Sequence, residues 1–358
     1  MKPVTIVGTC VLIAATAALG GARQQRPAPK QTQIADGIYL FQTAPYGDVG
    51  MDGNSIAILS NDGVLVFDSN GTPAASALVL AEIRKLTDKP VRYVVNSHWH
   101  WDHWYGTETY TKAFPDVKVV AHEKSREMMA GPAIEFNRPG LEKQLPGYVA
   151  MLEQRVATRP ELEPALAEAR FFLDQKKNAK LVLPTVTYKD RLDLTLGERR
   201  IQVRHFDRAV TPGDSFLYLP SEKILITGDL LINPISFALS SYPTSWLRTL
   251  EMMDALDVDI IVPGHGQVLR DETLLRAHMD VMRELLKTGK DAKARGLDAD
   301  QAKEEALPRL RDAMVKITRD DPKLNEQFKI YLVDWYMHRL YDELAGPLSD
   351  AISAIPPK

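Results

Sequence analysis

The chain has 358 residues, of which 45% are hydrophobic and 25% are charged, and its formal net charge at neutral pH is −3. These proportions are those of a globular protein and exclude an intrinsically disordered chain. The small net charge also argues against a nucleic-acid binder, because such a protein needs a basic surface to displace counterions from phosphates.

The first 22 residues predict a secretory signal peptide. Lys2 precedes an apolar run over 4–19, and small residues follow at 20–22. The run is short for a membrane span, which needs about 20 residues, and an uncleaved anchor is the alternative. We therefore expect a linker at 23–31, a secreted or periplasmic protein, and no stable membrane span after cleavage. Cys10, the only cysteine, lies in this segment, so His and carboxylate groups must hold any metal.

The next part of the chain predicts short strands around one helix. Strand patterns lie at 38–41, 55–59, 64–67, 91–95 and 117–121, with a hairpin turn at 61–63. Thr72 and Pro73 predict the N-cap and first residue of the helix. Residues 124–180 are mainly helical in pattern and interrupted by prolines. We interpret them as an insertion that covers the active-site edge with Met128, Met129 and Phe136, or else as peripheral helices.

The rest of the chain predicts further strands and then a helical tail. Strand patterns lie at 181–186, 192–196, 201–206, 216–219, 223–227 and 259–262, with a helix from about Trp246. From 272 to 358 the chain is helical in pattern, and Phe328, Tyr331 and Trp335 share one helix face. Such a face needs a partner surface, either the main domain or a second copy in a homodimer through the C-terminal helices.

Four candidate metal ligands lie within six residues: His98, His100, Asp102 and His103. In an extended segment, residues two apart point to the same side, so His98 and His100 can reach one ion. Asp102 and His103 come where the backbone should turn into a helix. Imidazole and carboxylate ligands without thiolate suit Zn²⁺, and also Fe or Mn.

Two further candidates follow strands later in the chain. Asp229 comes after a predicted strand and Gly228, and His265 lies in the tight segment 263–266 after another strand. Three strand ends that offer His and Asp indicate a sheet whose loops converge on one metal centre.

These motifs resemble those of the metallo-β-lactamase-fold hydrolases. Residues 98–103 match the family pattern His-x-His-x-Asp-His, and residues 211–214, 227–229 and 263–266 look like its later motifs in the same order. The resemblance, over about 32–271, implies an α/β fold, an αββα sandwich of two mixed β-sheets with helices outside. It also implies a site in which Asp229 bridges two ions. One ion would be held by Asp102, His103 and His265, and the other by His98 and His100.

One position departs from the family pattern. A third histidine is expected directly before Thr211, where this chain has Val210. His205 lies on the opposite face of the predicted strand, and Arg208 on the same face as Val210. Three outcomes stay open: a single ion at Asp102, His103, Asp229 and His265; two ions; or a fold retained for binding without catalysis.

The sequence therefore predicts an exported metal-dependent hydrolase. A metal-activated water would attack an ester, lactone, amide or related bond of a small-molecule substrate, and Asp102 would be the catalytic residue that orients the water. The alternatives are a non-catalytic or mononuclear binding protein and an iron-dependent sulfur oxygenase. Asp68 is expected either to hold a ligand imidazole or to form a turn.

Aromatic side chains near the motif are assigned by their spacing. Trp99 and Trp101 alternate with the ligand histidines, so we expect them to face away from the metal and pack in the core. Trp104, Phe237 and Tyr242 are the candidates for the pocket wall.

Overall fold

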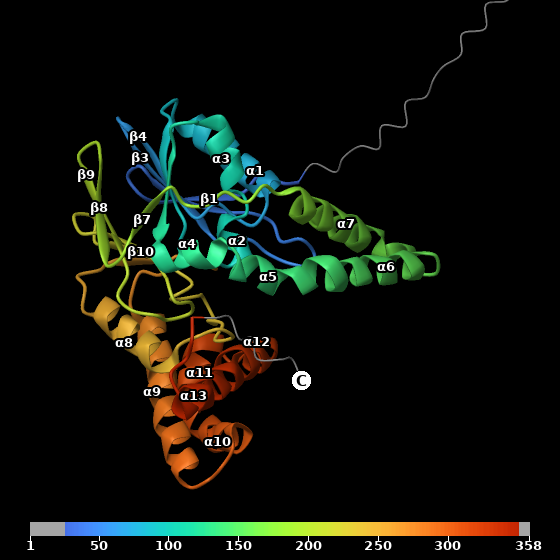
Figure 1. Ribbon diagram of the computed structural model, residues 1–358, viewed down its shortest axis with the longest axis vertical. Helices are drawn as coiled ribbons and strands as arrows, with labels where there is room; N and C mark the ends of the chain where they lie inside the picture. Colours follow the sequence, from blue (N-terminus) through green and yellow to red (C-terminus); the bar gives the residue numbers. More distant parts are fainter. Residues whose placement is uncertain (1–25, 351–358) are drawn as a thin grey trace, which may run out of the picture.

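The computed structural model describes residues 26–350 (Figure 1). The predicted signal peptide lies outside the described residues. Within the described part of the chain, no helix is long and apolar enough to cross a membrane.

The first sheet has seven strands that neighbour one another in chain order. They are β1 (Lys30–Ala35), β2 (Ile38–Gln42), β3 (Ser55–Ser60), β4 (Gly63–Phe67), β5 (Val91–Val95), β6 (Lys118–His122) and β7 (Val186–Tyr188). The strands β1 to β4 pair antiparallel, and β4 to β7 pair parallel. The hairpin between β3 and β4 confirms the predicted turn. Two expectations were wrong: β1 begins inside the expected linker, and most of 181–186 is irregular.

The second sheet has five strands in the order β12-β11-β10-β9-β8. They are β8 (Arg191–Leu196), β9 (Arg199–Arg204), β10 (Phe216–Leu219), β11 (Ile224–Gly228) and β12 (Ile260–Pro263). Only β11 and β12 pair parallel, so this sheet is also mixed.

The two sheets face one another across an apolar core. Leu40, Ile56 and Phe67 of the first sheet pack with Val203 and Leu217 of the second. Burying one such side chain stabilises the fold by roughly 1.5–3 kcal/mol. Helices cover the outer faces: α1 (Pro73–Leu86) and α3 (Thr107–Ala113) on the first sheet, α8 (Pro243–Asp254) and α9 (Thr273–Ala294) on the second. This arrangement confirms the predicted αββα sandwich.

The segment between β6 and β7 is helical and extends from the body of the molecule (Figure 1). It comprises α4 (Glu123–Met129), α5 (Pro132–Pro139), η1 (Gly140–Gln144), α6 (Leu145–Val156), η2 (Pro160–Leu162) and α7 (Glu163–Asn178). Polar contacts tie α7 back to the body. Arg26 pairs with Glu168 at 2.6 Å, and the Gln175 side chain accepts a hydrogen bond from the backbone of Ala74 at 3.1 Å.

The C-terminal helices pack against α8 and α9. They are α10 (Ala299–Ala306), η3 (Leu307–Leu310), α11 (Arg311–Thr318), α12 (Pro322–Gln327), η4 (Phe328–Asp334) and α13 (Trp335–Ala345). Tyr336, Met337 and Leu340 are buried in one cluster with Trp246 and Leu250 of α8. Of the predicted face, Phe328 is buried in this cluster, whereas Tyr331 and Trp335 are only partly buried, so the main domain covers part of this apolar face.

Candidate metal centre

The predicted ligands meet at one edge of the sandwich because they follow strands that end there. The motif at 98–103 follows β5, Asp229 follows β11, and His265 follows β12. The short helix α2 (Trp101–Trp104) begins directly after His100, which turns Asp102 and His103 toward the ends of the second sheet.

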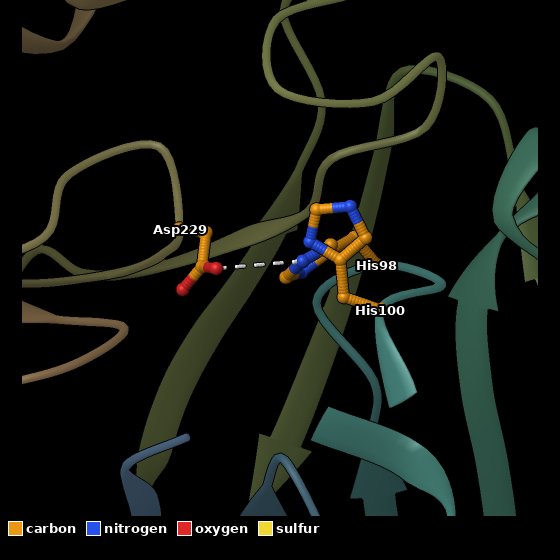
Figure 2. Close-up of side chains that lie close together, drawn as sticks. All are labelled: His98, His100 and Asp229. Carbon is orange, nitrogen blue, oxygen red and sulfur yellow. Dashed lines mark ion pairs between the residues drawn. The ribbon is translucent and has the colours of Figure 1, made fainter. Parts of the chain in front are cut away.

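The first group consists of His98, His100 and Asp229 (Figure 2). Each offers one ligand atom, and these atoms lie within 4.8 Å of one another. The Nε2 atom of His98 is 3.6 Å from Oδ2 of Asp229. Such spacing is what a shared cation needs, with ligand bonds of about 2.0–2.2 Å for zinc.

The second group consists of Asp102, His103 and His265, whose ligand atoms also lie within 4.8 Å of one another. The Oδ2 atom of Asp102 is 3.2 Å from Nε2 of His103 and 3.0 Å from Nε2 of His265. The Oδ1 atom of Asp229 lies 3.3 Å and 3.5 Å from the same two nitrogens. Asp229 therefore faces both groups, one with each carboxylate oxygen.

The residues present fit a pair of divalent cations. His98 Nε2, His103 Nε2 and Asp229 Oδ1 are buried and have no hydrogen-bond partner among the described residues. Buried polar atoms are nearly always paired, so three that point at a common centre indicate an absent partner. Two imidazoles with a carboxylate in each group form a donor set suited to Zn²⁺.

Electrostatics around the two groups favour a cation. Burial lowers the pKa of His98 and of His100, so these imidazoles are neutral and free to act as ligands. Burial also opposes charge on His103, but the carboxylates of Asp229 and Asp102 raise its pKa well above the ordinary value. The negative charge that does so would equally attract a metal ion.

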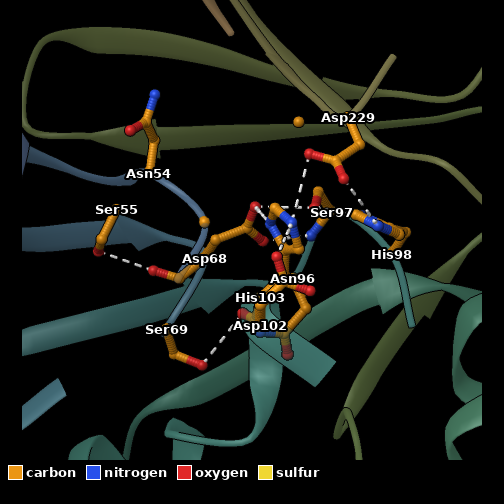
Figure 3. A network of polar contacts seen from close by, with 12 residues as sticks. Asn54, Ser55, Asp68, Ser69, Asn96, Ser97, His98, Asp102, His103 and Asp229 are labelled. Carbon is orange, nitrogen blue, oxygen red and sulfur yellow. Dashed lines mark hydrogen bonds and ion pairs between the residues drawn. The ribbon is translucent and has the colours of Figure 1, made fainter. Parts of the chain in front are cut away.

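Asp68 contacts the second group through His103, on the ring nitrogen that does not face the other ligands (Figure 3). Its Oδ2 accepts a hydrogen bond from Nδ1 of His103 at 2.7 Å, which leaves Nε2 of His103 for a cation. The Ser97 hydroxyl donates to the same carboxylate at 2.8 Å and lies 2.8 Å from Nδ1 of His98. Of the two roles expected for Asp68, the contact with a ligand imidazole is present, and its φ of 60° also fits a turn.

The segment 52–54 between β2 and β3 contributes residues that the sequence did not indicate. A Cβ atom at Gly53 would overlap the His103 ring, so only glycine fits beside this imidazole. Asn54 donates from its side chain to the carbonyl of Pro263 at 2.8 Å and so fixes the loop that carries His265. No strand or helix pattern marks this segment in the sequence. The only sequence feature that could have indicated a role near the site was a glycine next to an asparagine.

The Val210 side chain is buried in the core, and no further histidine joins the first group among the described residues. His205 stacks on His122 with ring centroids 4.0 Å apart. Arg208 lies over Tyr242 and donates to the carbonyl of Leu348 at 2.9 Å, so it does not reach the site. Instead, the Ser240 hydroxyl donates to the carbonyl of Val210 at 3.0 Å and lies 3.5 Å from Nε2 of His100.

A third group of His and Asp side chains lies in the C-terminal helices, away from this edge: Asp300, Asp334 and His338. All three are partly exposed, and the Lys303 ammonium lies 3.2 Å from Asp300 and 2.7 Å from Asp334. A lysine already neutralises these carboxylates, so this group is an ion-pair network.

A cavity of about 850 Å³ opens beside the two metal-ligand groups. Phe136 and Phe237 line it as expected, whereas Met128 and Met129 do not, because they are buried in a cluster with Trp99 and Trp104. Trp99 is buried in a core cluster as predicted and also borders the cavity. The prediction for Trp101 was wrong, because it is only partly buried and lines the cavity: the helix that starts at Trp101 breaks the strand alternation. Trp104 and Tyr242 do not line it. Trp104 is buried with its indole N–H donating to the Trp99 carbonyl, and the Tyr242 hydroxyl donates to Ser349.

Comparisons with known proteins agree with this geometry. The chain is 24% identical over 223 residues to the linear primary-alkylsulfatase of Pseudomonas sp. (strain ATCC 19151), covering 58% of this chain and 40% of that protein. The sec-alkylsulfatase Pisa1 from Pseudomonas sp. matches 90% of this chain and 51% of its own, with 18% identity and a TM-score of 0.59. A metallo-beta-lactamase from Pontibacter korlensis matches 71% of this chain and 99% of its own, with 18% identity and a TM-score of 0.53.

The chain thus spans less than two thirds of the length of the alkylsulfatases that it matches. The model of the metallo-beta-lactamase superfamily matches residues 49–265, which contain all six predicted ligands. The chain therefore belongs to the metallo-beta-lactamase superfamily, as its motifs predicted.

Proposed function

We propose that this protein is an exported metal-dependent hydrolase that cleaves an ester, lactone, amide or related bond of a small molecule. The observation that supports it best is the pair of three-residue groups that share Asp229 beside a cavity. The first group offers three protein donors, which leaves a coordination position for water, the pattern of a catalytic rather than a structural zinc site; the second group offers four once the shared Asp229 is counted. We propose zinc at both groups, with His98 and His100 sufficient at the first despite Val210.

The chain's own residues have distinct roles in this reaction. Bound divalent cations would lower the pKa of a water and polarise the scissile carbonyl. Asp102 reaches both His103 and His265 through Oδ2, which leaves its other oxygen to orient the attacking water and take up its proton. Asp68 keeps His103 in the tautomer that presents Nε2.

A second candidate reaction is hydrolysis of a sulfate ester. It is favoured by the similarity to the linear primary-alkylsulfatase and to sec-alkylsulfatase Pisa1, although this chain covers only 40% and 51% of those proteins. Both candidates use the same centre, so the substrate separates them.

Export and assembly are further parts of the proposal. The basic and apolar pattern of residues 1–22 supports export to the periplasm or the medium. A homodimer through the C-terminal helices has the exposed side chains of Val315 and Ile330 in its favour. Analytical ultracentrifugation of the mature protein tests the dimer, and a monomer at all concentrations removes it.

The test of the hydrolase is metal analysis joined to turnover. Protein purified without added metal or chelator should carry zinc, lose hydrolysis of para-nitrophenyl esters on chelation, and regain it with zinc. Protein that binds no metal tightly under any reconstitution would contradict the proposal and favour a binding protein. Iron as the native metal, with oxygen consumption, would favour the sulfur oxygenase.

A further inference from the structure

The cavity beside the metal-ligand groups has an aromatic wall built from four distant parts of the chain. It comprises Trp99 and Trp101 beside the ligands, Phe136 of α5, Phe237 after β11, and Tyr331 and Trp335 of the C-terminal helices. The ring centroids of Phe237 and Tyr331 are 5.0 Å apart, and those of Tyr331 and Trp335 are 4.9 Å apart. On the other side, Trp99 and Phe136 are 5.5 Å apart. Packed rings of this kind form a rigid apolar surface.

Outside the metal-ligand groups, the charged side chains that line the cavity are acidic. Asp48 contributes a carboxylate there in addition to those of Asp102 and Asp229, and no Lys or Arg of residues 26–350 belongs to the lining. The half-buried Lys176 lies against aromatic rings instead, with its Nζ atom 3.9 Å from the centre of the Trp101 ring and 3.8 Å from that of Tyr105, and burial lowers the pKa of this amine well below its ordinary value. An anionic group placed away from the metal-ligand groups therefore finds no lysine or arginine in this cavity.

We infer that the substrate is an uncharged carboxylic ester or lactone with an apolar acyl or aryl body, and that esters carrying a further negative charge, sulfate esters included, are excluded. This inference rests on the proposed hydrolase function. An uncharged body fills the aromatic cavity and gains free energy from apolar burial. An anionic body would lose its hydration against the aromatic wall without a lysine or arginine of the lining to offset its charge, which is costly.

The reaction is balanced by water alone. Water supplies the new oxygen on the acyl carbon, the bond between that carbon and the alcohol oxygen breaks, and the alcohol oxygen takes up a proton. The main charge to be stabilised in the transition state is then the negative charge that develops on the carbonyl oxygen. A sulfate ester instead brings three charge-bearing oxygens, and those not held by cations would face the rings of Trp99 and Trp101.

A matched pair of esters tests this selectivity on the zinc-loaded full chain. Para-nitrophenyl hexanoate and mono-para-nitrophenyl adipate share the leaving group and the chain length and differ by a terminal carboxylate. We expect kcat/KM to be about ten-fold or more higher for the hexanoate, and para-nitrophenyl sulfate to turn over no faster than the adipate. A smaller preference, or faster turnover of the sulfate, overturns the inference.

Adding a cation to the wall should reverse part of this preference. Gln327 lines the cavity, so Gln327→Lys should raise the ratio of kcat/KM for adipate over hexanoate by about five-fold or more. Gln154 is exposed on α6 outside the lining, so Gln154→Lys is the matched control and should leave the ratio unchanged. If Gln327→Lys also leaves it unchanged, the acyl body does not occupy this cavity.

Binding without turnover separates failure of this inference from failure of the hydrolase function. Three tryptophans line the cavity, so quenching of tryptophan fluorescence reports occupancy. We expect methyl octyl ketone to bind at least about ten-fold more tightly than decyl sulfate. Tighter binding of the ketone without turnover of any ester would support the cavity preference and contradict the hydrolase. Turnover with equally tight binding of decyl sulfate would do the opposite.

Discussion

The two halves of the metal centre are built differently although they share Asp229. The second group, Asp102, His103 and His265, is braced by Asp68 at 2.7 Å and by a glycine that only just clears the His103 ring. The first group has Val210 where the family pattern has a ligand, and its support comes from the hydroxyls of Ser97 and Ser240. We therefore expect the second group to hold its cation more tightly, with the first as the exchangeable site.

Removing the shared ligand should have the largest effect because it damages both groups at once. Asp229→Asn leaves one neutral oxygen between five other ligands, so we expect zinc content to fall to one ion or fewer per chain. Ester hydrolysis should fall by about a thousand-fold or more. The exposed Asp259 provides the matched control, and Asp259→Asn should change neither quantity. Two tightly bound ions in Asp229→Asn would show that Asp229 is not shared.

Removing the hydrogen bond between Asp68 and His103 should have the next largest effect on metal binding. Asp68→Asn replaces the acceptor of the His103 Nδ1 hydrogen bond by an amide, so His103 loses its fixed tautomer. We expect affinity for the tighter of two zinc ions to fall by about 10–100-fold, measured by competition with a chromophoric chelator. Ser97→Ala is the comparison, since the Ser97 hydroxyl contacts both the Asp68 carboxylate and His98. Unchanged affinity in Asp68→Asn would contradict the role given to Asp68.

Introducing the histidine of the family pattern at position 210 should raise the metal affinity of the first group. Val210→His places an imidazole where the resemblance expects one, so the affinity for the more weakly bound ion should rise by about ten-fold or more. Val210→Leu controls for the change in volume. If Val210→His alters neither the affinity nor the number of ions bound, the side chain of residue 210 does not face the first group.

The loop that carries Ser240 is held by a hydrogen bond to neutral His278. Replacing His278 should have the smallest effect on metal binding. His278 accepts a hydrogen bond from the backbone of Ser236 at 3.3 Å and lies 2.9 Å from the carbonyl of Leu274. Burial lowers the pKa of His278 to about 4 from its ordinary value of 6.5. The unfolded chain therefore binds a proton more readily, and stability should be complete above about pH 6.5 and decline as pH falls toward 4.

At roughly 1.4 kcal/mol per pKa unit, His278 should account for a loss of about 3 kcal/mol in unfolding free energy over this range. Denaturant unfolding of the metal-free protein at several pH values measures it. His278→Asn should be less stable at neutral pH and show a shallower decline with acid, while zinc affinity changes by less than about three-fold. An unaltered slope in His278→Asn would assign the acid sensitivity to other groups.

The parts of the site that the sequence could predict are those with local signals. Four of the ligands lie within the contiguous segment 98–103. The other two, Asp229 and His265, each follow an apolar strand, and the ends of these strands were expected at the same edge of the sheet as the motif. The sheets followed from apolar runs and turn residues, such as the hairpin at 61–63. The αββα arrangement itself rested on the resemblance, and the structure confirmed it.

The parts that could not be predicted depend on where one segment meets another. The strand alternation correctly placed Trp99 in the core, but it also placed Trp101 there, whereas the helix that starts at Trp101 turns this side chain toward the cavity. The helix face with Tyr331 and Trp335 was recognised, but not that it would wall the active-site cavity. Gly53 matters only because His103, 50 positions later in the chain, packs against it.

The most direct test of the account is to locate the metal ions in crystals of the zinc-loaded protein by anomalous scattering at the zinc edge. We expect two peaks, one bounded by His98, His100 and Asp229, and one bounded by Asp102, His103 and His265. The second should keep its occupancy longer when crystals are soaked in a weak chelator. Anomalous density away from all six side chains, or none after zinc loading, would contradict the claim that they form one metal centre.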